Sequence, residues 1–208
     1  MTKEKRLIDI ASQIRSLAQT GLVYSQIEYD RERYEELLTL SHEITALVSD
    51  SKLEDISNLF RIEDDYVTPK TDIRAVVFDD ENRILLVQEG VNKLWSLPGG
   101  WADVGYSPKE VAIKEVKEET GLDVAPVRLL AVMDKKCHPH PPATHYCYKI
   151  FILCKITGGT FSKAFDIANQ GFFAQDEIPP LSEDRVLKEQ LDMMFEYHNN
   201  PLKECWID

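Results

Sequence analysis

Three glutamates, Glu115, Glu118 and Glu119, are the residues whose types and spacing most directly suggest chemistry. An α-helix turns by about 100° per residue, which puts Glu118 about 60° to one side of Glu115 and Glu119 about 40° to the other. Carboxylates on one narrow helix face repel one another and weaken the helix. A hard divalent cation would relieve that repulsion, and all-oxygen ligands favour Mg²⁺, Mn²⁺ or Ca²⁺ over zinc. The spacing predicts either a metal site or a solvated acidic face.

A helix over 107–120 is predicted to present these carboxylates. Ser107 can cap its first turn, Pro108 suits the position that follows, and Gly121 can end it. Lys114 borders Glu118 one turn on, so we expect it to neutralise only part of the acidic cluster. A bound divalent cation would neutralise the remaining negative charge, and a solvated acidic face stays the alternative at this point.

The segment that contains this helix resembles the Nudix box, a family motif that runs from a glycine through spaced acidic residues to a second glycine. The matching positions are Gly100, Tyr106, Lys114, Glu115, Val116, Glu118, Glu119, Gly121 and Leu122, preceded by Leu97, Pro98 and Gly99. Every interval agrees, and a match over many positions is a specific signal. Tyr106 stands where the family has its first, more peripheral glutamate, and Lys114 stands where it has arginine. Lysine keeps the charge but loses the bidentate fork.

The resemblance covers Thr71 to about His198, and it implies a mixed α/β (α+β) fold, the Nudix α/β/α sandwich with a mixed sheet. It implies that Glu115, Glu118 and Glu119 are catalytic. It further implies that the same three side chains and the Gly100 carbonyl bind Mg²⁺, with Mn²⁺ as a substitute.

The resemblance also implies a reaction, in which water attacks one phosphorus of a diphosphate bridge. The stretches WSLPGGWADVGYSP and DKKCHPHPP resemble a bacterial subgroup that contains CDP-choline pyrophosphatase and proteins named as ADP-ribose pyrophosphatases. CDP-choline or a similar nucleoside diphosphate joined to a group X (NDP-X) is the expected substrate. ADP-ribose, an oxidised nucleotide, and a non-catalytic nucleotide sensor remain alternatives.

Five residues outside the carboxylate cluster are candidates for binding the substrate: Arg74, Trp101, Tyr106, His138 and His140. Arg74 could reach a phosphate, although a surface ion pair explains it equally well. An aromatic ring could stack on a base or face a choline cation, but core packing is a common alternative. The candidates for a general base are Asp134, His138, His140 and Glu183, for each of which an exposed loop position is the simpler explanation.

The first sixty residues have a different pattern from the rest of the chain. Apolar residues recur there at three- and four-residue spacing, which predicts helices with apolar stripes. Gly21 is expected to end the first of them. These helices are too few to enclose a large core alone, so they should pack on the rest of the chain or on a second copy. We expect a small helical domain over residues 1–66, either an element that joins two copies into a homodimer or a simple N-terminal extension of the core, followed by the Nudix domain over residues 67–208.

In that second region we expect strands at 73–78, 83–87, 95–97, 127–133, 146–156 and 171–174, and a last helix at 184–198. Residues 135–144, which contain three prolines, should form a loop.

The composition excludes several classes of protein. The 208 residues carry a formal net charge of −12, which argues against a nucleic-acid-binding protein, since such binding depends on Lys and Arg. Four cysteines without a CxxC pair predict neither a zinc site nor a disulfide framework. No apolar stretch is long enough to span a bilayer, and the N-terminus lacks the pattern of a signal peptide. The cytoplasm is the expected location, with a small nucleotide as partner.

Overall fold

The computed structural model describes residues 2–60, 66–143, 145–162, 164 and 166–208. It consists of two compact units. A helical unit comprises residues 1–69 together with 141–146, and a second unit, called the catalytic unit because it contains the residues expected to be catalytic, comprises residues 70–140 and 147–208. The second unit is thus interrupted in the sequence by residues 141–146, which include the end of the loop expected at 135–144.

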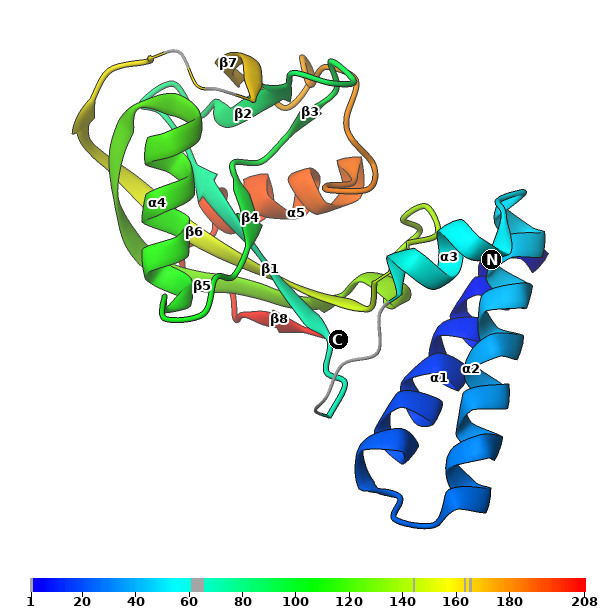
Figure 1. Ribbon diagram of the computed structural model, residues 1–208. Coiled ribbons are helices and arrows are strands. Elements are labelled where there is room, and N and C mark those ends of the chain that lie inside the picture. The colour runs from blue at the N-terminus through cyan, green and yellow to red at the C-terminus, as the bar shows by residue number, and fades with distance from the viewer. Residues whose placement is uncertain (1, 61–65, 144, 163, 165) are drawn as a thin grey trace. The chain divides into compact units, whose positions relative to one another are not determined.

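The helical unit contains three helices, α1 (Lys3–Tyr24), α2 (Glu28–Ser49) and α3 (Leu53–Leu59), coloured blue to cyan in Figure 1. Gly21 does not end the first helix as expected, because α1 continues through it to Tyr24. A Cβ atom at Gly21 would collide with the ring of Tyr34. The glycine thus allows α1 and α2 to approach closely, which overrides its usual role at a helix end.

The catalytic unit is built on two sheets. The first has the strand order β4 (Gly99–Trp101), β1 (Lys70–Val77), β6 (Cys147–Gly159), β5 (Leu122–Asp134) and β8 (Trp206–Ile207). The second has the order β3 (Trp95–Ser96), β2 (Ile84–Glu89) and β7 (Ile167–Phe173). In the first sheet β1 runs parallel to β6 and antiparallel to β4, so the sheet is mixed as expected.

Alternating side chains of β1 face two different cores, as the period of a strand requires. Ile73 and Val77 pack with the apolar face of α4 (Pro108–Thr120), whereas Val76 packs with that of α5 (Lys188–Asn199). The two helices accordingly cover opposite faces of the first sheet (Figure 1). This arrangement confirms the α/β/α sandwich.

The start of α4 confirms the expected cap and adds a detail. The Ser107 hydroxyl accepts a hydrogen bond from Glu110 N, and the Glu110 carboxylate accepts one from Ser107 N, which forms a capping box. Gly121 ends the helix with φ 82°, a conformation that favours glycine. Local residues thus determine both where α4 begins and where it ends.

Other elements differ from expectation at their ends. Strand β5 begins five residues early and continues past Pro126, where the pairing with β6 is irregular. Helix α5 begins at Lys188 rather than at 184, and strand β8 was not expected. A short 3₁₀ turn, η1 (Lys135–Cys137), opens the expected loop. Within the described residues no helix has both the length and the apolarity to cross a membrane.

Candidate active site

Glu119 is the most buried of the three candidate metal-binding carboxylates. Its side chain lies on α4 in a residue that is 8% exposed, and its Oε2 accepts a hydrogen bond of 3.0 Å from Gly99 N. Burial raises the pKa of this carboxyl to about 8, even though the nearby Arg74 charge and the Gly99 hydrogen bond act to lower it. A further positive charge nearby would therefore stabilise the ionised form of Glu119.

Glu115 lies one turn earlier, against the backbone of Gly100. A Cβ atom at Gly100 would be 3.2 Å from Glu115 Oε2, so a larger residue would crowd the carboxylate. Burial also raises the pKa of Glu115, and the Glu118 charge adds to that effect. The Gly100 backbone and two carboxylates of raised pKa therefore lie in one region, at the edge formed by β4 and α4.

Glu118 is more exposed, and a lysine lies between it and its neighbours. Lys114 Nζ is 3.1 Å from Glu118 Oε2, 3.5 Å from Glu115 Oε1 and 3.6 Å from Asp103 Oδ2. Its hydrogen bond to Glu118 raises the pKa of the Lys114 ammonium. Lys114 thus contacts two of the three cluster carboxylates and also Asp103 outside the cluster, which agrees with the expected partial neutralisation. Among the described residues no three acidic, histidine or cysteine side chains are already gathered as a metal site.

The turn from Leu97 to Gly100 positions this cluster against the sheet. Pro98 O accepts a hydrogen bond of 2.9 Å from Ala75 N on β1. Gly99 has φ 144°, and a Cβ atom there would collide with the Ile73 carbonyl. Only glycine fits this close approach, because any side chain would push the turn away from β1.

Arg74, expected near phosphate, is 4% exposed and is held inside the unit. Its Nε lies 3.1 Å from Asp72 Oδ2, its Nη2 lies 2.8 Å from Asp72 Oδ1, and its Nη1 donates to Leu97 O at 3.0 Å. The charges of Asp72, Glu119 and Glu89 raise the pKa of Arg74. The structure therefore places Arg74 beside the carboxylate cluster as an interior cation.

The two aromatic candidates lie on the surface at the edge that leads into α4. Trp101 is 51% exposed and ends β4 directly after Gly100, and Tyr106 is 50% exposed just before the helix cap. Both rings are therefore half exposed in the segment between Gly100 and the start of α4, whereas Trp95 is buried in the core as expected.

The two candidate histidines contact other parts of the chain. His138 Nε2 lies 2.9 Å from Asp208 Oδ2. His140 is 2% exposed; its Nδ1 donates to Glu183 O at 2.5 Å, and its Nε2 lies 3.1 Å from Gln190 Nε2. Burial lowers the pKa of His140 to about 3, so the ring is neutral. His140 is therefore a buried residue whose two ring nitrogens contact Glu183 and Gln190.

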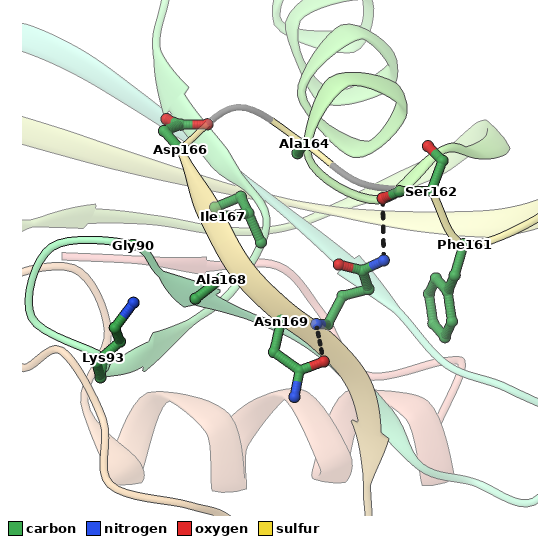
Figure 2. Close-up of a pocket in the computed structure, with 10 residues that line it drawn as sticks. Gly90, Lys93, Phe161, Ser162, Ala164, Asp166, Ile167, Ala168 and Asn169 are labelled. Carbon is green, nitrogen blue, oxygen red and sulfur yellow. Dashed lines mark hydrogen bonds between the residues drawn. The ribbon is translucent and has the colours of Figure 1, made fainter.

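A cavity of about 580 Å³ lies along β7 and the segment that precedes it (Figure 2). One lining residue, Ser162, donates its backbone N–H to Thr120 O at the end of α4, next to Glu119 in the sequence. It is lined by Gly90, Lys93, Phe161, Ser162, Ala164, Asp166, Ile167, Ala168, Asn169 and Gln170. The Asp166 charge contributes to the raised pKa of Glu119, which places this wall of the cavity close to the cluster. Asn169 Oδ1 accepts from Gln170 N, and Gln170 Nε2 donates to Ser162 O. The cavity thus combines two carboxamides, an acid, a lysine and one aromatic ring.

Several residues of this region were not anticipated from the sequence, namely Asp72, Glu89, Lys93, Asp103, Lys149 and Asp166. A signal existed for two of them. Asp72 and Lys149 lie among apolar residues in buried strands, and a charged residue inside a buried strand requires a partner. The others lie in turns or at strand ends, where charged residues are common.

The donor set fits a hard divalent cation. Carboxylate and carbonyl oxygens at Gly100, Glu115, Glu118 and Glu119 are the ligands that Mg²⁺ and Mn²⁺ prefer. Burial disfavours the ionised forms of Glu115 and Glu119 and so raises the pKa of both, and a bound cation would stabilise those ionised forms. A cation here would take over the charge balance that Lys114 and Arg74 now provide.

Comparisons with known proteins agree with this geometry. Residues 68–191 match the NUDIX domain, and residues 5–60 match a UDP-X-like, N-terminal oligomerisation domain. A Bacillus subtilis (strain 168) protein, YjhB, which carries the provisional name of an ADP-ribose pyrophosphatase, is 45% identical over 99% of this chain and 98% of its own.

Two solved structures are also similar. A Streptococcus suis ADP-ribose pyrophosphatase is 43% identical, with a TM-score of 0.62 over 68% of this chain and 100% of its own. A UDP-X diphosphatase is 34% identical, with a TM-score of 0.64 over 100% of both chains. The Nudix match spans more than half of the sequence and includes the carboxylate helix described above. The chain therefore belongs to the Nudix hydrolase family, and it joins a Nudix domain to an N-terminal helical domain of the UDP-X-like type.

Proposed function

We propose that the protein is a Mg²⁺-dependent hydrolase that cuts the diphosphate bond of an NDP-X substrate into a nucleoside monophosphate and a phosphorylated X. The observation that carries this proposal is the position of Glu115 and Glu119 on α4, where the Glu119 carboxylate accepts a hydrogen bond from Gly99 N and the Glu115 carboxylate lies against the Gly100 backbone. Carboxylate and carbonyl oxygens gathered in this way suit a cation that brings a diphosphate with it.

In this proposal Glu115, Glu118, Glu119 and the Gly100 carbonyl hold the metal. When bound, the metal would neutralise the bridge oxygens and lower the pKa of the attacking water. Lys114 gives up its carboxylate contacts and can then face the substrate phosphates. One glutamate of the cluster accepts the proton of water, and Asp166, which lines the cavity and whose charge acts on Glu119, is a further acid on the cavity side. The buried His140 is not used, because its ring nitrogens are engaged.

The ends of the substrate would lie on two surfaces next to the cluster. The cavity in Figure 2 offers hydrogen-bond donors and acceptors for one end. The exposed rings of Trp101 and Tyr106 offer a stacking or cation–π surface for the other. CDP-choline, with a cationic choline, fits this pair of surfaces and gives CMP and phosphocholine. ADP-ribose is the second candidate, favoured by the names of two similar proteins.

A substrate panel tests the proposal. The full-length protein is incubated with Mg²⁺ and CDP-choline, ADP-ribose, a UDP-sugar or an oxidised nucleoside triphosphate, and products are identified by ³¹P NMR in H₂¹⁸O. We expect diphosphate cleavage of one NDP-X compound, with ¹⁸O in one product.

Lys93→Met should raise KM for that compound about fivefold with little change in kcat, whereas the exposed control Lys155→Met should change neither. Absence of turnover with every compound would overturn the proposal and favour a nucleotide sensor.

We also infer that the helical unit joins two copies of the chain. Leu37, Leu40 and Leu47 lie within about 80° of one another around α2, and they are 39%, 45% and 84% exposed. An apolar stripe of this kind suits an interface between copies, and the family of this unit is an oligomerisation domain.

The expected assembly is a homodimer, and light scattering after size exclusion checks it. Leu40→Glu/Leu47→Glu should convert a dimer to a monomer, whereas Glu35→Lys, about 160° away from Leu37 around α2, should leave it intact. A double variant that stays dimeric would contradict this assembly. A cytoplasmic location stays a prediction.

A further inference from the structure

Three charged side chains, Lys149, Asp72 and Arg74, contact one another in the interior of the catalytic unit. Lys149 on β6 contacts Asp72 on β1, its direct neighbour in the strand register. Asp72 in turn holds Arg74 through both carboxylate oxygens. Lys149 is 1% exposed, and Asp72 and Arg74 are each 4% exposed. Such burial of three charges is costly unless they serve one another or a further group.

Arg74 is the centre of this group, because three carboxylates act on it. The charges of Asp72, Glu119 and Glu89 all raise its pKa. Two of those acids also have a second cation: Lys149 contacts Asp72, and Arg185 contacts Glu89. Glu119 has no second cation of this kind among the described ion pairs. Arg74 can therefore stabilise the Glu119 carboxylate only to the extent that Lys149 and Arg185 neutralise the other two acids, Asp72 and Glu89.

Arg74 also fixes the turn that carries the metal-binding backbone. Its Nη1 donates to Leu97 O, and two residues later Gly99 N donates to Glu119 Oε2. Gly99 pairs with Arg74 in the register between β1 and β4. A shift of the guanidinium toward Asp72 would therefore disturb the turn as well as the charge beside Glu119.

We propose that Lys149 is a positioning residue for the Nudix reaction: by neutralising Asp72 it leaves Arg74 oriented on the Leu97 carbonyl, with its charge available to Glu119. This inference rests on the proposed function. Lys149 acts through two other side chains. The order Lys149, Asp72, Arg74, Glu119 alternates in sign, so the removal of one member leaves its neighbour unbalanced in a low-dielectric interior.

Charge removal at Lys149 tests the inference, with two readouts. Lys149→Met should lower kcat about tenfold with KM within about twofold, because misplacement of catalytic groups affects turnover more than binding. The Kd for Mn²⁺, measured by electron paramagnetic resonance without substrate, should rise about fivefold since the turn and Glu119 are held less firmly. Arg83→Met, which removes a cation from the Arg83–Asp79 pair at the far end of β1, is the control and should change neither quantity.

A double variant keeps the test decisive if Lys149→Met does not fold. Asp72→Asn/Lys149→Met removes both charges of the pair, and buried pairs replaced as a whole are tolerated better than single removals. It should return kcat and the Mn²⁺ Kd to within about threefold of wild type, because Arg74 is no longer drawn to an unbalanced acid.

Two results would overturn the inference. One is wild-type turnover and Mn²⁺ affinity in Lys149→Met. The other is a double variant with wild-type Tm that is tenfold slower than wild type, since Lys149 would then not act through the Asp72 charge. A wild-type protein that binds Mn²⁺ but hydrolyses no compound of the panel refutes the proposed function alone, and the Mn²⁺ affinities of the variants still decide the role of Lys149.

Discussion

Two buried carboxylates of the catalytic unit, Asp72 and Glu119, have pKa values that are shifted in opposite directions. Asp72 is 4% exposed, and its pKa is nevertheless lowered, because Arg74 and Lys149 outweigh the effect of burial. Glu119 is 8% exposed, and its pKa is raised to about 8, because burial outweighs Arg74 and the Gly99 hydrogen bond. Burial raises the pKa of both groups, but Asp72 has two nearby cations, Arg74 and Lys149, whereas at Glu119 the one cation, Arg74, is opposed by the like charges of Glu115 and Asp166.

This difference separates a charge that the chain itself balances from one that we propose binds a metal. The Asp72 group is balanced by the chain itself, so it can remain ionised without any ligand. The cluster around Glu119 is left partly unbalanced, and such a site gains most from a cation supplied by solution. The following predictions test this distinction, beginning with the largest effect.

Glu118→Gln should lower turnover by at least about tenfold, because it removes a metal-binding oxygen charge from the unbalanced cluster. The side chain is 59% exposed, so the Tm should stay close to that of wild type. Steady-state kinetics and thermal unfolding check the two parts. Glu189→Gln, on the exposed side of α5, is the matched control with unchanged turnover. Wild-type activity in the Glu118 variant would remove this residue from the site.

Gly99→Ala should disrupt the turn at which the two groups of charges meet. The added Cβ would collide with the Ile73 carbonyl at φ 144°, which should cost about 2–3 kcal/mol of unfolding free energy and lower turnover as well. Gly105→Ala provides the comparison, because φ is 95° there but no atom lies within 4 Å of the added Cβ. Its cost should be about 1 kcal/mol. Equal losses on denaturant unfolding would show that backbone strain alone matters.

The pH dependence of stability should show the smallest effect. The native pKa of Glu119, about 8, lies above its ordinary value of 4.5, so the folded state binds more protons than the unfolded state between these pH values. The stability of the metal-free protein due to this group therefore falls as the pH rises from 4.5 to 8. Mg²⁺ requires the ionised carboxylate, so the Tm gain from Mg²⁺ should increase over the same range.

Thermal unfolding at pH 6 and pH 8.5, with and without Mg²⁺, measures this effect. The difference between wild type and Glu119→Gln isolates Glu119 from the other groups that titrate. In wild type we expect the Mg²⁺-induced gain in Tm to be a few degrees larger at pH 8.5 than at pH 6. In Glu119→Gln this difference between the two pH values should be absent. A Mg²⁺-induced gain that is equal at both pH values would mean that Glu119 is already ionised in the folded protein.

Local order in this protein could be predicted well from the sequence. The Ser107 cap, Pro108 and Gly121 determined α4, and the spacing of Glu115, Glu118 and Glu119 determined that they share a face. Both are properties of a few neighbouring residues, and a helix has only one geometry in which to express them. The Nudix match over residues 68–191 follows from the same short segment and its surroundings.

The partners of each charge were decided only by the tertiary structure. Arg74 could not be assigned to the interior until β1 paired with β4 and β6, which placed Asp72, Lys149 and the Leu97 carbonyl around it. Gly21 and His140 differ from expectation for the same reason, since Tyr34 and Gln190 lie 13 and 50 residues away along the chain. Electrostatic balance depends on distance in space, and the sequence states only distance along the chain.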